Sequence, residues 1–203
     1  MITIVDYKAG NLTSVKRALD HLCIPNQISA DPHVVAKAGR VIFPGVGAAG
    51  AAMSVLKERG LDDALRESFH KGTPILGICI GCQIIMEHSE EDDTECLGLL
   101  PGACVRFRVD DPTLKIPHMG WNAVSVLKAH PILGHLRPGD EFYFVHSFHP
   151  QPSDPALIYA ESDHGGSFPA AIGKDNLFAV QFHTEKSGPV GLKVLENFAQ
   201  WNA

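Results

Sequence analysis

A cysteine stands between two glycines in the segment "TPILGICIGCQ", residues 73–83. The pattern Gly77-Ile78-Cys79-Ile80-Gly81 has the spacing of a nucleophile elbow, in which a sharp strand-to-helix turn lifts one side chain above a sheet. Glycine suits the flanking positions because the chain passes close to itself there. The start of a helix favours a thiolate, and the main-chain N–H of Ile80 points the same way. We therefore predict that Cys79 is a nucleophile; the alternative is a buried structural cysteine.

A histidine and a carboxylate follow a late apolar strand, in "VQFHTEKSG", residues 180–188. His183 and Glu185 lie two residues apart, so on an extended chain they share a face. An acid at this spacing can orient an imidazole whose other nitrogen meets a thiol. The pattern predicts a catalytic triad of Cys79, His183 and Glu185, although a lone histidine is more often structural.

A glycine-rich loop follows another strand, in "FPGVGAAG", residues 43–50. Gly45 and Gly47 would leave the amides of Val46 and Gly47 free to face a ligand and to supply a second oxyanion donor. The alternative is an ordinary tight turn. A phosphate-binding loop is excluded because no G-K-[ST] follows.

Two other kinds of site, a thiol redox pair and a metal centre, are alternatives to this prediction. Cys79 and Cys82 form a C-x-x-C pair, which is also typical of thiol redox proteins. His146 and His149 form H-x-x-H, but on a strand their side chains point to opposite faces, and no further ligand stands beside them. We expect no metal and no cofactor.

The elements that would position these residues change character halfway along the chain. The first half reads as alternating apolar strands and amphipathic helices, which is typical of an open parallel sheet covered on both faces. The second half reads mostly as antiparallel strands joined by short turns. The expected strands are 2–5, 26–29, 40–47, 73–79, 103–109, 121–127, 141–147, 156–162, 168–173 and 177–183, and the expected helices are 11–22, 48–58, 61–71, 81–88 and 188–203. We predict an α/β fold, an open, mostly parallel, doubly wound sheet with an antiparallel extension, in one domain over residues 1–203.

The composition is that of an ordinary globular protein, with 203 residues, 45% hydrophobic and 20% charged, and a net charge of −6. The longest basic run is a pair, so we do not expect nucleic acid as a partner. No apolar run reaches membrane-spanning length, and the first residues lack a signal-peptide pattern. We expect a cytoplasmic protein in which the five cysteines are thiols.

With these pieces in order, the chain resembles the class I glutamine amidotransferases, whose fold is flavodoxin-like. It is most similar to the glutaminase subunits of imidazole glycerol phosphate synthases, from histidine biosynthesis. The resemblance covers essentially the whole chain and rests on "DYKAGN" (6–11), "FPGVG" (43–47), "GICIGCQ" (77–83), "PHMGWN" (117–122), "YFVHSFH" (143–149) and "FHTEKSG" (182–188).

The resemblance implies that Cys79 attacks the side-chain amide of glutamine while His183 moves the proton and Glu185 orients it. The amides of Val46, Gly47 and Ile80 would hold the oxyanion. Ammonia would pass to a partner cyclase, a (β/α)8 barrel, which makes imidazole glycerol phosphate and aminoimidazole carboxamide ribotide. Residues matching the family's glutamine site are Gly45, Gln83, Glu91, His146, Ser147 and Phe148. Residues matching its subunit interface are Asn11, Met119, Trp121, Asn122, Tyr143 and Lys186.

The sequence departs from the family pattern at Thr184, where proline is usual, at Cys82, where methionine is usual, and at Phe148, where tyrosine is common. Three alternatives remain beside the glutaminase reading. They are a subunit of another class I amidotransferase, a thiol redox protein using Cys79 and Cys82, and an inactive scaffold that binds a barrel. The intact Cys79, His183 and Glu185 argue against the scaffold.

Overall fold

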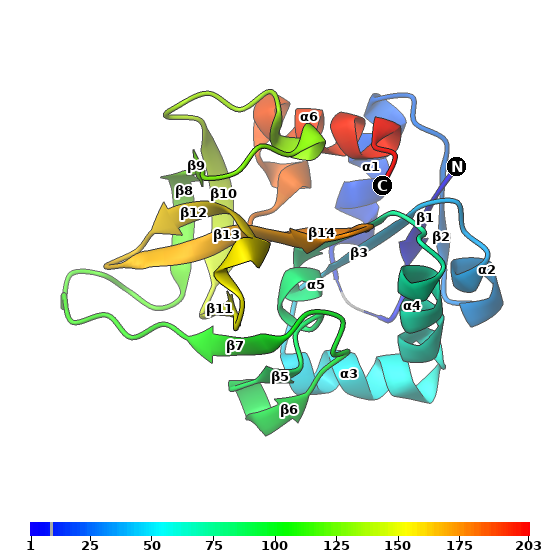
Figure 1. Cartoon of the computed structure of the whole chain (residues 1–203), viewed down its shortest axis with the longest axis horizontal. Coiled ribbons are helices and arrows are strands. Elements are labelled where there is room, and N and C mark those ends of the chain that lie inside the picture. Colours follow the sequence, from blue (N-terminus) through cyan, green and yellow to red (C-terminus); the bar gives the residue numbers. More distant parts are fainter. Residues whose placement is uncertain (9) are drawn as a thin grey trace.

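The computed structural model describes residues 1–8 and 10–203, and a mixed sheet runs through its centre (Figure 1). Its eight strands lie in the order β2-β1-β3-β4-β14-β13-β12-β9. The first five pair in parallel and the remaining pairs are antiparallel. Their bounds are β1 Ile2–Val5, β2 Asn26–Ser29, β3 Val41–Gly45, β4 Ile75–Cys79, β9 Ser125–Val126, β12 Ile158–Asp163, β13 Ser167–Lys174 and β14 Leu177–Val180.

Helices cover both faces of the parallel part (Figure 1). Helices α1 (Leu12–His21) and α6 (Gly188–Gln200) pack on one face, and α2 (Pro32–Ala36), α3 (Ala49–Glu58) and α4 (Leu61–His70) pack on the other. The strands are buried on both sides and read as continuous apolar runs, as parallel strands between two helical layers must. The predicted doubly wound α/β fold with an antiparallel extension is confirmed.

Two small sheets flank the carboxyl ends of the parallel strands. Strands β8 (His118–Ala123) and β10 (Glu141–His146) form an antiparallel pair, and β11 (Phe148–Pro152), β7 (Gly102–Arg106), β5 (His88–Ser89) and β6 (Thr94–Glu95) form the other sheet in that order. Short 3-10 turns are η1 (Glu91–Asp93), η2 (Pro131–Leu133), η3 (Pro155–Leu157) and η4 (Thr184–Lys186). Residues of β10, β11 and η1 line much of the cavity at the strand ends where Cys79 lies.

Several elements differ from the sequence prediction. The helix expected at 81–88 is a single turn, α5 (Ile80–Gln83), because residues 97–100 donate to the carbonyls of 84–86 and draw the chain away. The strand expected at 121–127 is divided between β8 and β9, which belong to different sheets. Helix α2 and strands β5, β6 and β11 were not predicted.

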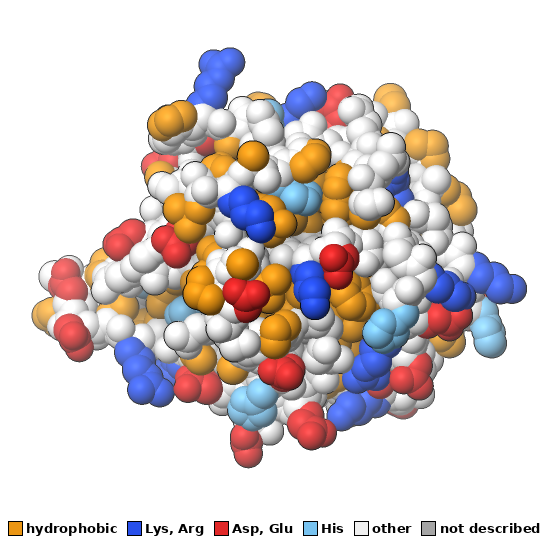
Figure 2. Space-filling model, in the orientation of Figure 1, with side chains coloured by type: hydrophobic (Ala, Val, Ile, Leu, Met, Phe, Trp, Pro, Cys, Tyr) orange, Lys and Arg blue, Asp and Glu red, His pale blue; other side chains and the backbone are white. Residues whose placement is uncertain are grey.

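The surface mixes charges, and on the face in Figure 2 basic and acidic side chains are interspersed with apolar ones. Within residues 1–8 and 10–203, no helix is both long and apolar enough to cross a membrane.

Candidate active site

Cys79 ends strand β4 and begins α5, and neighbouring strands flank it. Gly45 is its partner in β3, and Val180 of β14 pairs with Ile78, so Gln181 follows beside Cys79. The backbone of Cys79 has φ 55° and ψ −106°, a conformation that L residues rarely adopt. Such strain at a strand-to-helix turn presents the side chain above the sheet, as the elbow pattern predicts.

The glycines around Cys79 explain how the chain makes this turn. A Cβ on Gly81 would lie 1.9 Å from the carbonyl oxygen of Phe43, and one on Gly77 would lie 2.7 Å from the carbonyl oxygen of Gly81. Neither position has room for a side chain, which confirms the prediction that the chain passes close to itself there. The elbow is therefore set by backbone packing between β3, β4 and α5.

His183 follows β14 and its ring is fully buried beside the carboxylate of Glu185. Nδ1 of His183 lies 2.7 Å from Oε1 of Glu185, and both side chains have no exposed surface. Within the described residues Nε2 has no hydrogen-bond partner. Burial lowers the pKa of His183, but the attraction of the charged ring to the sulfur of Cys79 and to Glu185 outweighs it and raises that pKa to about 9. Burial raises the pKa of Glu185, but His183 outweighs it, so the carboxyl pKa is lowered.

Asn11 also holds the Glu185 carboxylate. Its Nδ2 donates to Oε1 of Glu185 and lies 3.4 Å from Nδ1 of His183. Asn11 directly precedes α1, but its φ is 78° and its side chain makes no capping hydrogen bond. Asn11 therefore serves the buried acid rather than the helix.

Thr184 replaces the proline of the family pattern, yet the backbone between His183 and Glu185 is well held. The segment forms η4, and Gly191 packs so closely on it that a Cβ there would lie 2.1 Å from the Thr184 carbonyl oxygen. The Thr184 hydroxyl adds a weak contact, 3.5 Å, to Oε2 of Glu185. Packing against α6 thus fixes the geometry that proline would otherwise restrict.

A cavity of about 310 Å³ opens above Cys79. It brings together nearly all the residues predicted for the oxyanion and glutamine sites: Val46, Gly47, Cys79, Ile80, Gln83, Glu91, His146, Ser147 and Phe148, with Pro117 and Val145. Gly45 does not line it. A Cβ on Gly45 would lie 1.9 Å from Oη of Tyr7, so this glycine is needed where the buried Tyr7 ring crosses β3.

Polar groups in the cavity wall are oriented by neighbouring elements. Oε2 of Glu91 accepts the main-chain N–H of Ala49 at 2.8 Å, and burial raises the pKa of this carboxyl. Both ring nitrogens of His146 are engaged, with Nε2 3.1 Å from Nδ1 of His118 and Nδ1 2.7 Å from the Phe148 carbonyl oxygen. Burial lowers the pKa of His146 to about 3. His146 therefore shapes the wall as a neutral ring.

The residues predicted for the partner interface lie in three places, and one of them, Asn11, contacts Glu185 as described above. Met119 and Trp121 of β8 are 63% and 54% exposed, and the register pairs Trp121 with the half-buried Tyr143 of β10. Nζ of Lys186 lies 5.8 Å from the centre of the Tyr143 ring. These four residues, the β8–β10 patch, share one face. Asn122 faces the other way and donates to His118 and to the carbonyl oxygen of Asp163.

The two cysteines of the C-x-x-C pair lie in different hydrophobic cores. Cys79 belongs to the core between the sheet and helices α1 and α6, whereas Cys82 belongs to the core between the sheet and helices α3 and α4. Cys82 is fully buried, and burial raises its pKa well above the ordinary range of a thiol. This arrangement does not favour a redox pair, which needs an accessible, reactive thiolate.

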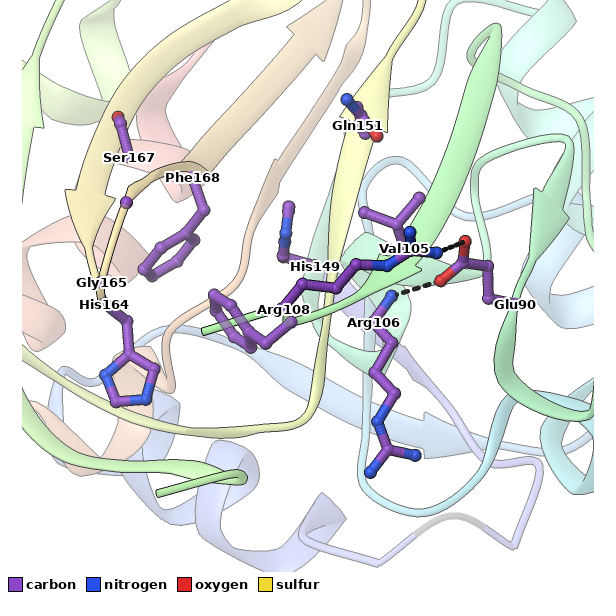
Figure 3. Close-up of a pocket in the computed structure, with 12 residues that line it drawn as sticks. Glu90, Val105, Arg106, Arg108, His149, Gln151, His164, Gly165, Ser167 and Phe168 are labelled. Atoms are coloured by element: carbon purple, nitrogen blue, oxygen red, sulfur yellow. Dashed lines mark hydrogen bonds and ion pairs between the residues drawn. The ribbon is translucent and has the colours of Figure 1, made fainter. Parts of the chain in front are cut away.

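His146 and His149, weighed as metal ligands, line different cavities. His149 lines another cavity of about 360 Å³ with Arg108 and Phe168 (Figure 3). Glu90 at its edge accepts the N–H of Arg106 at 2.8 Å and pairs with Arg108. In the part of the chain that the structure describes, no three or more His, Cys, Asp or Glu side chains are grouped to hold a metal ion.

One residue that the sequence analysis missed touches the predicted nucleophile. Nε2 of Gln181 lies 3.8 Å from Sγ of Cys79, and its side chain is fully buried. The signal was a polar residue inside the apolar run "LFAVQF", two positions before His183 and so on the same face.

A family model described as glutamine amidotransferase class-I matches residues 3–201. Solved structures support the fold, among them one titled "Crystal structure of glutamine amidotransferase" (TM-score 0.76, 16% identity, 98% of each chain). Another is PurLQS from Thermotoga maritima (TM-score 0.76, 18% identity, 98% of this chain and 97% of that one). The chain belongs to the class I glutamine amidotransferases.

Curated relatives narrow this class. The chain is 49% identical to imidazole glycerol phosphate synthase subunit HisH of Desulfovibrio desulfuricans, over 99% of this chain and 94% of the relative. It is 46% identical to the subunit of the same name from Aromatoleum aromaticum, over 98% of each. Within its class the chain therefore belongs to the HisH subunits of imidazole glycerol phosphate synthase, the glutamine amidotransferase subunits of histidine biosynthesis.

Proposed function

We propose that Cys79, His183 and Glu185 hydrolyse glutamine and that the ammonia passes to a (β/α)8-barrel cyclase bound to this chain. The observation that carries the proposal is the buried His183–Glu185 pair, 2.7 Å apart, beside a strained cysteine that opens into a cavity. Glu185 keeps one ring nitrogen of His183 engaged, which leaves Nε2 for the thiol proton.

The reaction follows from these positions. Sγ of Cys79 gives its proton to Nε2 of His183 and attacks the side-chain carbonyl carbon of glutamine. The carbonyl oxygen becomes an oxyanion, for which we assign the main-chain amides of Ile80 and of the Val46–Gly47 loop. Collapse of this intermediate breaks the carbon–nitrogen bond, and the proton on His183 leaves with ammonia.

A γ-glutamyl thioester on Cys79 remains. Water attacks it while His183 accepts a proton, and the bond to sulfur breaks to release glutamate and the free thiol. Glu91 would pair with the ammonium of the substrate, since its Oε2 is held by Ala49 and it lines the same cavity. We assign the β8–β10 patch to the cyclase, with Trp121 as its aromatic anchor.

The test is glutamate release by the chain alone, with the barrel cyclase, and with the cyclase and its ribotide ligand. We expect release to be strongest in the complete mixture and to be lost in Cys79→Ala. A partner that leaves the rate unchanged would contradict the coupling, and release by Cys79→Ala would contradict the nucleophile.

A further inference from the structure

The geometry points to Gln181 as a further catalytic residue, one that donates a hydrogen bond to the thiolate of Cys79. This inference deepens the proposed function, because it concerns the same nucleophile. The first observation is the position of Gln181. The parallel register that pairs Val180 with Ile78 places Gln181 beside Cys79 at the carboxyl ends of β14 and β4. The main chain of Gln181 is fixed as well, since its N–H donates to the carbonyl oxygen of Ala170 at 2.9 Å.

The orientation of the Gln181 amide follows from the groups around it. Nε2 of Gln83 lies 2.8 Å from the carbonyl oxygen of Phe148, and a carbonyl can only accept. The same Nε2 lies 3.1 Å from Gln181, so the atom of Gln181 that faces it must be the amide oxygen, Oε1. The amide nitrogen of Gln181 therefore faces Sγ of Cys79, at 3.8 Å.

This contact is of a kind that strengthens when the sulfur becomes charged. A neutral thiol is a weak acceptor, whereas hydrogen bonds to an ionised acceptor are roughly twice as strong as neutral ones. Gln181 is fully buried and Gln83 is 5% exposed, so water competes little for the donor. The Gln181 amide is thus a donor that the structure already places within hydrogen-bonding distance of the sulfur, at 3.8 Å, whereas Nε2 of His183 has no partner among the described residues.

The Phe148 carbonyl oxygen ties this pair of amides to the cavity wall. It accepts from Gln83 and lies 2.7 Å from Nδ1 of His146, so the donor to sulfur is braced by two elements, α5 and β11. Gln83 was predicted to hold glutamine, and it lines the cavity. Its amide group also donates to Oε1 of Gln181 and so orients the Gln181 amide with its nitrogen toward the sulfur.

The inference also describes both halves of the reaction. A donor to the thiolate favours ionisation of Cys79 before attack and stabilises the same thiolate as it leaves the thioester. Removing the donor should therefore lower kcat more than it changes the KM for glutamine.

The experiment measures alkylation of Cys79 by iodoacetamide as a function of pH, in a Cys23→Ser background because Cys23 is exposed. Mass spectrometry of the Cys79 peptide gives the rate. Gln181→Met keeps the length and removes the donor. We expect alkylation at neutral pH to slow about tenfold and the midpoint of the pH–rate profile to move upward.

The matched control is Asn176→Leu. Asn176 stands at the opposite end of β14, is also a buried amide, and donates to the carbonyl oxygens of Phe69 and Thr73. It should destabilise the same strand yet leave the alkylation profile unchanged. An unchanged profile in folded Gln181→Met, or an equal shift in Asn176→Leu, would overturn the inference.

A measurement on the unmutated side chain covers the case in which Gln181→Met does not fold. In a chain labelled with 15N-glutamine, the side-chain resonance of Gln181 should move with the same pH midpoint as alkylation. A resonance that ignores this titration would overturn the inference. Alkylation of Cys79 does not require glutamine. The result therefore tests the role of Gln181 separately from the proposal that the chain hydrolyses glutamine.

Discussion

The main-chain N–H of His183 donates to the carbonyl oxygen of Tyr143 at 2.9 Å. This bond joins the proposed base to strand β10, whose Tyr143 also packs against the exposed Trp121. Ser187 adds a second link, since its hydroxyl accepts the N–H of Tyr143 at 3.0 Å and donates to the His183 carbonyl oxygen. The main chain that carries the buried imidazole is therefore hydrogen-bonded to the strand that carries Tyr143 of the β8–β10 patch.

The Glu185→Gln substitution removes the negative charge of this side chain while keeping nearly the same shape. The amide can still contact His183, but it no longer stabilises the imidazolium that forms when the thiol gives up its proton. We expect kcat for glutamine hydrolysis to fall by about 100-fold, with a smaller change in KM. Steady-state kinetics in the presence of the cyclase measure this, and a change confined to KM would contradict the role.

The raised pKa of His183 predicts a fall in activity at high pH. With that pKa at about 9, the ring retains the proton that it takes from Cys79 until ammonia leaves, and it can no longer hold this proton once the pH passes 9. We expect kcat to decline above pH 9 and the decline to begin at lower pH in Glu185→Gln.

The titration of His183 should also lower the stability of the folded chain at high pH. Its folded-state pKa lies above the ordinary 6.5, so its contribution to stability is complete below pH 6.5 and is lost as the pH rises through 9. Thermal unfolding of the isolated chain between pH 6 and 10 should show a larger loss than in Glu185→Gln. Equal losses would contradict this linkage.

Gly81→Ala should break the elbow. The new Cβ would meet the Phe43 carbonyl oxygen at 1.9 Å, a main-chain atom that cannot move aside without displacing β3. We expect a loss of about 3 kcal/mol in the free energy of unfolding, together with loss of glutaminase activity. Gly39→Ala is the control, because nothing lies within 4 Å of its Cβ, and it should stay within about 0.5 kcal/mol.

Trp121→Ala should weaken binding to the cyclase without affecting the stability of the chain. Its side chain is 54% exposed, so little packing is lost, while an aromatic anchor typically costs about 2 kcal/mol or more of binding free energy when truncated. Titration calorimetry with the barrel subunit measures this. Leu127→Ala, 56% exposed and outside the β8–β10 patch, is the control. Equal affinities for both variants would argue against this surface.

Much of the fold and of the site was predictable because the signals are local. Apolar strand runs and the glycine–cysteine–glycine spacing depend only on neighbouring residues, and the elbow and the doubly wound sheet followed from them. The residues of the cavity wall were instead implied by the resemblance to the family. Asn122 was predicted for the interface, but adjacent residues of a strand point to opposite faces, so its side chain faces away from Trp121 and contacts His118 instead.

The features that escaped prediction depend on contacts between distant parts of the chain. The helix after Cys79 stops at Gln83 because residues 97–100 bond to its continuation. The contact of Asn11 with Glu185 was not predicted because the two residues are 174 positions apart in the sequence. Gln181 gains its role only through the pairing of β14 with β4 and through Gln83.

The most direct test of the central claim is to look for the covalent intermediate. The chain with the cyclase and ribotide ligand is mixed with glutamine, quenched in acid, digested and analysed by mass spectrometry. The account predicts a glutamyl group on the peptide that carries Cys79, in thioester linkage labile to hydroxylamine, and none in Cys79→Ala. Hydrolysis of glutamine with the glutamyl group on another residue, or undiminished in Cys79→Ala, would contradict it.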